Sequence, residues 1–431
     1  MLSVDSWAGP AVPELDGNAV EVQVFDAVSA AVRPVRVEAG RATIYVCGIT
    51  PYDATHLGHA ATYLAFDTLN RALRQAGVEV EFAENITDVD DPLFERAGRD
   101  GVDWRELAES QTDLFRGDME ALRVIPPHAF VRVQDALPEI ATAVAQLVAD
   151  GFAYEVPTES SAGNDLYLDL EAVQQRTSFE LGSLSHFSPE RLAEAFVEFG
   201  GDPQREGKRC PLDPLLWRAA REGEPSWPGG EGVPAGRPGW HVECSVISTG
   251  NLTTPDAGPL VSLQGGGQDL VFPHHEMSAA HTSALTGREF AGHFTHAGLI
   301  SYRGEKMSKS LGNLVLVSRL TAAGHEAAAI RLTILSHHYR ESWEWFDSEL
   351  SANEARLVSW REAAARAQLQ PESNTEGGES ATRQRIRAAI ANDLDTPAAI
   401  VVVDEWAASE HPASDVPETV DALLGIDLLG R

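Results

Sequence analysis

Lysine is the scarcest basic residue of this chain, and its positions suggest phosphate chemistry. The 431 residues include 33 lysines and arginines, of which only Lys208, Lys306 and Lys309 are lysines. Two of these three lie in the run Lys306-Met307-Ser308-Lys309-Ser310. Lysine is a compact, mobile point charge, whereas arginine is a rigid planar fork. A flexible loop that must follow moving phosphates is a place where exchange for arginine would be harmful.

A second phosphate-binding signature lies upstream, at His56-Leu57-Gly58-His59, where a loop is expected to become a helix. Helix N-terminal amides favour anions, and Gly58 would allow a nucleotide to approach closely. Two histidines three residues apart can face one side of a first helical turn and donate hydrogen bonds to phosphate oxygens. Alone, this motif could be two ordinary polar residues. Together with the lysine run, it predicts ATP-driven activation of a carboxylate.

Three cysteines, Cys47, Cys210 and Cys244, complete the reactive side chains. An odd and sparse set argues against a disulfide framework and for a reducing compartment, so we expect a cytoplasmic protein. Cys47, Cys244 and His274 are too far apart along the chain for a zinc ribbon. Spacing alone favours two buried structural cysteines and a histidine at the start of a helix. Cys210, next to Pro211, is expected to have no role in the site.

The elements that must position these residues indicate an α/β fold. A β-rich run over 42–48 ends in glycine and is followed by the His56 motif, a helical pattern over 60–76 and a second strand over 78–85. This order predicts a βαβ unit of a parallel sheet. Alternating apolar and polar residues over 20–38 predict an N-terminal hairpin.

Later segments complete this organisation. The stretch from about 157 to 239 is rich in glycine, proline and polar residues, and we interpret it as an insertion between two halves of the sheet. The remaining expected elements are helices over 102–123 and 134–150, a segment over 240–249 that resumes the second half, a strand over 260–264 before the glycines 265–267, a helix from Pro273, and a strand over 299–302. The predicted fold is a split, Rossmann-like parallel α/β sheet with this insertion.

The C-terminal part differs in character. We expect a catalytic domain over 1–316 and a helical stem and C-terminal helical region over 317–431, with a disordered linker near 370–380. Residues 347–431 carry 16 Asp and Glu, seven Arg and no Lys. The whole chain has a formal net charge of -32, which repels polyanions at long range. A large nucleic-acid footprint is therefore not expected. Neither a secretory signal nor a membrane span is expected.

The two phosphate motifs, in this order around a split parallel sheet, resemble the catalytic domain of class I aminoacyl-tRNA synthetases, which has the HUP-type fold. The resemblance implies that His56 and His59 hold ATP, and that Lys306 and Lys309 stabilise the departing pyrophosphate. The chemistry is electrostatic stabilisation of charge that develops on the α-phosphate and its leaving group. ATP is expected to be used with Mg²⁺.

The sequences around Cys47, Cys244 and His274 resemble those of cysteinyl-tRNA synthetases in particular, in which these positions bind one zinc ion. Cysteine and serine differ by one atom, and an apolar pocket separates such isosteres poorly, whereas zinc prefers a soft thiolate. In those synthetases the residue four after the histidine is typically a glutamate that completes the zinc shell; here it is Ser278. A three-ligand site with one open position is implied, although harmless drift is the alternative.

The resemblance also implies the surroundings of the cysteinyl-adenylate. Trp240 would pack against the amino acid, Asp269 would pair with the substrate ammonium or merely cap a helix, and Ile300 would line the adenine side. The full implied set is Cys47, Gly48, Ile49, Thr50, Thr62, Asn85, Ile86, Thr87, Trp240, Gly267, Gln268, Asp269 and Ile300.

Three features favour one group within this family, the mycothiol-pathway cysteine ligases. They are Ser278, the short acidic tail, and the run Glu198-Phe199-Gly200-Gly201-Asp202-Pro203, close to that group's E-R-G-G-D-P signature. Phe199 stands where the signature has arginine, so the arginine contacts of that group are not expected here. The resemblance implies ligation of L-cysteine to the amine of glucosaminyl-inositol through a cysteinyl-adenylate, with release of AMP and pyrophosphate.

Two alternatives belong to other classes. A cysteinyl-tRNA synthetase with a shortened tail would charge tRNA, and a synthetase-like binding protein would catalyse nothing. Retention of two scarce lysines in the phosphate loop argues against the second. The expected partners are L-cysteine, ATP and glucosaminyl-inositol, without nucleic acid or membrane, and the expected state is a monomer. The sequence nominates no base for the second step.

Overall fold

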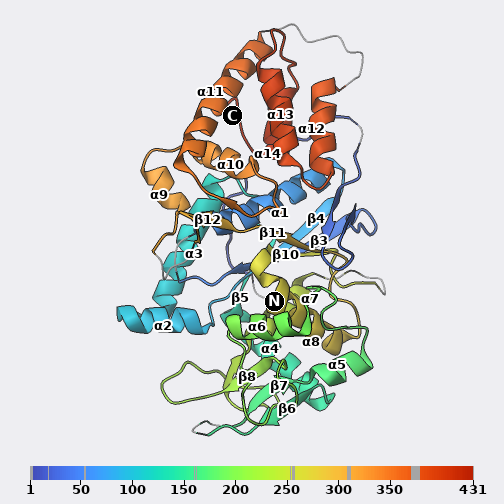
Figure 1. The fold of residues 1–431 in the computed structure, drawn as a ribbon, viewed down its shortest axis with the longest axis vertical. Helices are drawn as coiled ribbons and strands as arrows, with labels where there is room; N and C mark the ends of the chain where they lie inside the picture. The colour runs from blue at the N-terminus through green and yellow to red at the C-terminus, as the bar shows by residue number, and fades with distance from the viewer. Residues whose placement is uncertain are drawn as a thin grey trace.

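The centre of the protein is a five-stranded parallel sheet, seen in a computed structural model (Figure 1). The structure describes residues 3–17, 19–52, 55–159, 161, 163–252, 254, 258–307, 312–369 and 379–430. The strand order is β11-β10-β3-β4-β5. These strands are β3 (Arg41–Ile49), β4 (Glu79–Ile86), β5 (Ala129–Arg132), β10 (Leu263–Gly267) and β11 (Phe294–Ala297). Because β3 lies in the middle, the chain builds the sheet outward in two halves, as predicted.

Helices cover both faces of this sheet (Figure 1). One face packs against α1 (Leu57–Gln75), and the other against α4 (Val133–Ala149) and α7 (Trp240–Asn251), with α8 (Glu276–Thr286) behind them. Side chains alternate along β3, as the period of a strand requires. Ile44 and Val46 enter the core with α1, whereas Tyr45 and Cys47 enter the core with α4, α7 and α8. This alternation directs Cys47 toward α7.

The insertion between the sheet halves forms a sheet of its own. Its order β6-β7-β8-β9 is antiparallel throughout. The elements of this region are β6 (Ala153–Val156), β7 (Asp165–Leu168), α5 (Leu170–Arg176), α6 (Pro189–Glu198), β8 (Leu215–Ala219) and β9 (Gly236–Pro238). It lies at the opposite end of the molecule from the C-terminal helices (Figure 1).

The C-terminal part is mostly helical, as predicted. Its elements are α9 (Val317–Ala322), α10 (Ala327–Leu335), β14 (Trp343–Glu344), α11 (Asp347–Gln368), α12 (Ala381–Ala391), α13 (Thr396–Ala407) and α14 (Val416–Leu424). Helices α10, α12 and α14 contact α1 and share its apolar core. The expected linker over 370–380 falls largely outside the described residues.

Smaller elements connect these layers. The N-terminal hairpin is confirmed as β1 (Gln23–Asp26) paired with β2 (Ala31–Pro34). The strand expected near Leu299 is β12 (Ile300–Tyr302), which pairs with β13 (Glu305–Lys306) and β14. Helices α2 (Asp91–Asp100) and α3 (Trp104–Ala121) follow β4. No helix in the described part of the chain has both the length and the apolar character that a membrane span requires.

One predicted boundary was wrong, and one predicted helix has an irregular start. The strand expected over 260–264 is β10, which instead includes the glycines 265–267. A Cβ on Gly265 would lie 2.3 Å from the Phe66 ring, so the glycines are needed for close packing and do not end the strand. The helix expected from Pro273 is present as α8 over Glu276–Thr286, which directly follows a π-helical segment over Val271–His275 whose Phe272 has an extended backbone.

Candidate active site

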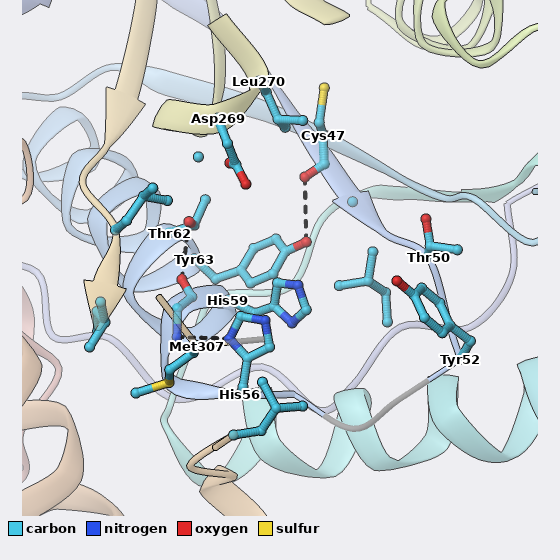
Figure 2. Close-up of a pocket in the computed structure, with 17 residues that line it drawn as sticks. Cys47, Thr50, Tyr52, His56, His59, Thr62, Tyr63, Asp269, Leu270 and Met307 are labelled. Carbon is cyan, nitrogen blue, oxygen red and sulfur yellow. Dashed lines mark hydrogen bonds between the residues drawn. The ribbon is translucent and has the colours of Figure 1, made fainter. Parts of the chain in front are cut away.

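A cleft of about 360 Å³ opens at the carboxyl ends of β3 and β10. This is where open parallel sheets bind their ligands. Figure 2 shows the side chains that converge on it. Its lining includes eight residues expected around the adenylate or zinc, namely Cys47, Gly48, Ile49, Thr50, Thr62, Gly267, Asp269 and Ile300, together with His56 and His59. Residues separated by nearly 270 positions in the sequence therefore line one cavity.

The His56 motif lies at the start of α1, as predicted. His56 is the N-cap, and its Nδ1 accepts a hydrogen bond from the backbone amide of Gly58 at 3.1 Å. The rings of His56 and His59 stack at 3.8 Å and face the cleft (Figure 2). A Cβ on Gly58 would lie 2.8 Å from the His56 ring. Glycine at this position therefore allows the first histidine to fold back over the helix start.

The lysine run can be placed only in part. The backbone of Lys306 belongs to β13, and Met307 lines the cleft (Figure 2). The side chain of Lys306 and the whole of Lys309 lie outside what the structure describes. Their predicted role at the phosphates therefore stays a prediction.

Asn85 is buried behind the cleft and holds the end of β3 through side-chain hydrogen bonds. Its Oδ1 accepts hydrogen bonds from the Gly48 amide and the Tyr45 hydroxyl, both at 2.9 Å, and its Nδ2 donates to Thr87 Oγ1 at 2.9 Å. The β3–β4 register shifts between Val46 and Ile49. Asn85 thus fixes the irregular end of β3, whose residues line the cavity.

Some expected residues do not line this cleft. Asn85, Ile86 and Thr87 are buried beneath it. Gln268 accepts a hydrogen bond from the Ser342 hydroxyl at 3.3 Å, away from the cavity. Conversely, the sequence did not single out the cleft residues Tyr52, Tyr63, Leu270, Leu299 and Leu314, and it included Met307 only as a member of the lysine run. Most of these are apolar or aromatic and carry no pattern that distinguishes them from core residues.

The three expected zinc ligands do converge. Among the described residues, Cys47, Cys244 and His274 form the one group of Cys, His, Asp or Glu side chains whose ligand atoms all lie within 4.8 Å of one another. Cys47 Sγ lies 3.8 Å from Cys244 Sγ, and His274 Nε2 lies 3.2 Å from Cys244 Sγ. All three side chains are buried. Cys47 comes from β3, Cys244 from α7, and His274 from the turn before α8.

This group fits a tetrahedral zinc ion. Zinc at about 2.3 Å from two sulfurs holds those sulfurs about 3.8 Å apart. Without a cation, burial raises the pKa of the Cys244 thiol well above its usual range, and the nearby Cys47 raises it further. A bound cation would reverse this preference, because thiolates are stabilised by metals.

Further histidines lie close to this group and do not line the cleft. His241 Nδ1 lies 3.2 Å from His274 Nδ1, and the Trp240 ring stacks on His274 at 4.1 Å. His275 Nε2 lies 3.3 Å from Cys47 Sγ, while its Nδ1 lies 2.8 Å from His296 Nε2. Burial holds the pKa of His241 and His275 well below the usual range, so both rings are neutral. The only feature of the sequence that could have indicated a role for His241 is its position three residues before Cys244.

Ser278 does not join the three candidate ligands. Its hydroxyl donates to the carbonyl oxygen of His241 at 3.1 Å. Ser278 and His274 both contact His241, Ser278 at the His241 backbone carbonyl and His274 at the His241 ring. The hydrogen bond ties α8 to α7 and directs the hydroxyl at the backbone.

Comparison with known proteins of similar sequence establishes the family of this chain. Residues 34–355 match the family described as tRNA synthetases class I (C) catalytic domain. The L-cysteine:1D-myo-inositol 2-amino-2-deoxy-alpha-D-glucopyranoside ligase of Kytococcus sedentarius is 51% identical over 449 residues, covering 99% of this chain and 100% of the relative. The ligase of the same name from Paenarthrobacter aurescens is 49% identical, covering 98% and 100%. The chain belongs to this ligase family.

Solved structures place this ligase-family member among class I synthetases by fold. Methionyl-tRNA synthetase of Mycobacterium tuberculosis, in complex with methionyl-adenylate, has a TM-score of 0.62 at 18% identity, covering 89% of each chain. A leucyl-tRNA synthetase from Agrobacterium radiobacter has a TM-score of 0.61 at 13% identity, covering 90% of this chain and 84% of the other. The predicted fold class is confirmed.

The ligase-like run Glu198–Pro203 lies in the insertion and not in the cleft. Asp202 accepts hydrogen bonds from the Tyr167 hydroxyl and, at 2.9 Å, from Lys208 Nζ. The Lys208 ammonium is enclosed between the Tyr167 and Phe196 rings and has a side-chain exposure of only 2%. This third lysine therefore occupies a space that suits a compact ammonium. Phe199, the departure from the signature, packs on the apolar core of the insertion side.

Proposed function

We propose that this protein joins L-cysteine to the amine of glucosaminyl-inositol, using ATP and passing through a cysteinyl-adenylate, in mycothiol biosynthesis. The observation that carries the proposal is identity of 49–51% with ligases of that name over nearly the whole of both chains. The buried Cys47, Cys244 and His274 group supports it, because cysteine must be distinguished from serine.

The first step would form the adenylate. A cysteine carboxylate oxygen attacks the α-phosphorus of ATP, and the bond to the bridging oxygen breaks as pyrophosphate leaves with Mg²⁺. His56 and His59, stacked at the start of α1, are suited to donate hydrogen bonds to the phosphates. Lys306 and Lys309 would neutralise the leaving group. Positioning and charge neutralisation supply most of the acceleration in such reactions.

Cys47, Cys244 and His274 would hold one zinc ion beside this cleft. When bound, zinc would supply a soft Lewis acid with one open coordination position, which favours a thiol sulfur over a hydroxyl. The Trp240 ring stacked on His274, and the His241 ring beside it, would keep the imidazole in place. Cys47 reaches both the metal group and the cleft, which brings sulfur recognition close to the reacting carboxylate.

In the second step the amine would attack the carbonyl carbon of the mixed anhydride. The carbon–nitrogen bond forms as the carbon–oxygen bond to AMP breaks, and the amine loses a proton. Asp269 lines the cleft and can pair with the cysteine ammonium, which would keep that group away from reaction. The amine must be unprotonated to react, so the rate is expected to increase with pH until the amine is neutral.

The decisive experiment is product analysis by mass spectrometry after incubation with cysteine, ATP and glucosaminyl-inositol. The expected products are the cysteinyl amide, AMP and pyrophosphate in equal amounts. A parallel reaction would contain tRNA that accepts cysteine in place of the sugar. Efficient charging of that tRNA without amide formation would overturn the proposal in favour of a synthetase.

A further inference from the structure

A second polar cavity lies further along the same edge of the sheet. It has a volume of about 120 Å³ and is lined by Asp88, Arg105, Ala108, Glu109, Thr112, Arg132 and Gln134. Asp88 comes two residues after β4, Arg132 ends β5, and α3 supplies the facing wall. None of these residues lines the cleft at the His56 motif. The nucleotide and cysteine machinery therefore leaves this cavity unused.

The cavity is within reach of the reaction centre. The ends of β3, β4 and β5 are in register, since Ile49 pairs with Ile86 and Ile86 pairs with Arg132. Neighbouring strands are about 4.8 Å apart, so two spacings separate β3 and β5 by roughly 10 Å. Asp90, two residues after Asp88 in the chain, accepts a hydrogen bond through Oδ2 at 3.2 Å from Thr50, which lines the cleft.

The polar groups on the sheet side of the cavity are held in fixed positions, and those on α3 make contacts nearby. Asp88 is 1% exposed and accepts hydrogen bonds from the backbone amide of Gln134 at 3.0 Å and from its Nε2 at 2.6 Å. Glu109 lies 3.6 Å from Arg132, and the Arg105 guanidinium lies 4.2 Å from the centre of the Trp104 ring. These contacts orient acceptors and donors toward one space.

The charges of the lining select the class of ligand. The lining carries two carboxylates, Asp88 and Glu109, and two guanidiniums, Arg105 and Arg132, and Arg132 also pairs with Asp135 outside the lining at 2.8 Å. A polyphosphate or nucleic-acid backbone would need an excess of positive charge, and an apolar ligand would offer no hydrogen bonds to these charged groups. A neutral ring with many hydroxyls can both donate to the carboxylates and accept from the guanidiniums.

We propose that this cavity binds the cyclic polyol end of the amine acceptor, the inositol ring of glucosaminyl-inositol. The inference rests on the proposed function. An acceptor of two linked rings can then hold its amine at the adenylate while its second ring lies along the strand ends. Arg105 and Glu109 on α3, with Asp88 and Gln134 on the sheet side, determine the specificity for this ring.

The test uses the full-length enzyme with Arg105→Gln and Glu109→Gln, singly and together. Both side chains are exposed, so the fold should tolerate these changes. The KM for glucosaminyl-inositol in amide formation is expected to increase at least ~10-fold in the double variant. The inositol hydroxyls would lose their hydrogen bonds to two charged side chains. Cysteine-dependent ATP–pyrophosphate exchange should stay within about twofold of the wild type. Glu120→Gln, on the same helix but outside the cavity, is the control and should leave both unchanged.

Glucosamine without the inositol ring provides a second measurement. It lacks the ring assigned to this cavity, so its KM should be similar in the wild type and the double variant. An unchanged KM for the full acceptor in the double variant would overturn the cavity assignment alone. Failure of the wild type to make any amide, with exchange intact, would overturn the proposed function and this assignment with it.

Discussion

At the scale of single residues, the site depends on side chains whose chemistry cannot be supplied by a close substitute. Each of the described reactive groups is placed by a backbone feature: His56 by the start of α1, Cys47 by the alternation of β3, and His274 by the turn before α8. The His56 motif stood out by its residue types and spacing, whereas Cys47 and His274 were expected only from the resemblance to cysteinyl-tRNA synthetases. The neighbouring histidines carry no such signal, and only the structure shows that His241 and His275 contact the group of candidate ligands.

Lys309→Arg tests whether a compact ammonium is required in the phosphate loop. We expect adenylate formation to slow by at least ~10-fold, because a planar guanidinium cannot follow the leaving pyrophosphate in the same way. Binding of cysteine should change little. Pre-steady-state pyrophosphate release measures the rate, and Arg303→Lys in the preceding turn is the control. An unchanged rate would mean that this loop does not handle the leaving group.

Asp118 on α3 gives a prediction about pH. Burial raises the pKa of this carboxyl to about 6 despite a hydrogen bond with Thr55. The folded protein therefore binds this proton more tightly than the unfolded chain, so the stabilising effect is present below about pH 4 and is lost as the pH rises toward about 6. Asp118→Asn should raise the free energy of unfolding at pH 7 by on the order of 1 kcal/mol.

Denaturant unfolding at several pH values measures this effect. Burial also raises the pKa of Asp88 and Asp90 to about 6, whereas burial lowers the pKa of His241 and His275, so these groups act on the pH dependence in opposite directions. All four groups are shared by the two proteins, so the difference in stability between Asp118→Asn and the wild type isolates Asp118 and should grow in favour of the variant as the pH rises from 4 to 7. Parallel curves for the two proteins would show that Asp118 is not the group involved. The exposed Glu120→Gln serves as a reference on the same helix.

At the scale of elements, glycine positions decide how closely the strands approach their neighbours. The sequence correctly predicted β1, β3, α1 and β4, because their apolar periods are regular. It placed the end of β10 too early, since glycines 265–267 resemble a loop. Glycine is needed at these positions because of tertiary packing: side chains from α1 and from the turn before α8 occupy the space that a Cβ would need. Local patterns contain no information about such distant neighbours.

Gly266→Ala tests this packing directly. The new Cβ would lie 2.9 Å from the His275 ring, which contacts Cys47. The ring would have to move, and we expect zinc affinity to fall by roughly 10-fold or more, as second-shell changes do in other zinc sites. Competition with a chelating dye measures the affinity. Gly117→Ala, whose Cβ would meet nothing within 4 Å in α3, should leave the affinity unchanged. Equal affinities in the two variants would contradict this account.

At the scale of the whole molecule, a buried charge network joins α1 to the C-terminal helices. Asp67 on α1 pairs with Arg71 at 2.8 Å and with Arg331 on α10, and all three side chains are essentially inaccessible. Arg71 and Arg331 also donate to backbone carbonyls at the end of α14. The sequence indicated that the tail is helical and acidic, but it could not indicate this connection, because the partners are more than 250 positions apart.

Arg331→Met should therefore destabilise the protein as a unit. Removing one partner leaves a buried carboxylate less compensated, and breaking a buried pair costs about 3–5 kcal/mol. We expect a loss of at least ~2 kcal/mol, because Arg71 still contacts Asp67. Arg361→Met breaks an exposed pair with Glu326 and should cost less than about 1 kcal/mol. Urea unfolding measures both. Similar losses in the two variants would mean that the network does not hold the two parts together.

The measurement that tests the central claim most directly combines metal content with amino-acid selectivity. Zinc per chain and ATP–pyrophosphate exchange with cysteine and with serine would be measured for the wild type, Cys244→Ser and Cys210→Ser. The wild type and Cys210→Ser should hold one zinc and prefer cysteine by at least about 100-fold, whereas Cys244→Ser should lose both zinc and cysteine activation. A metal-free wild type that is fully active, or equal activation of serine, would contradict the account.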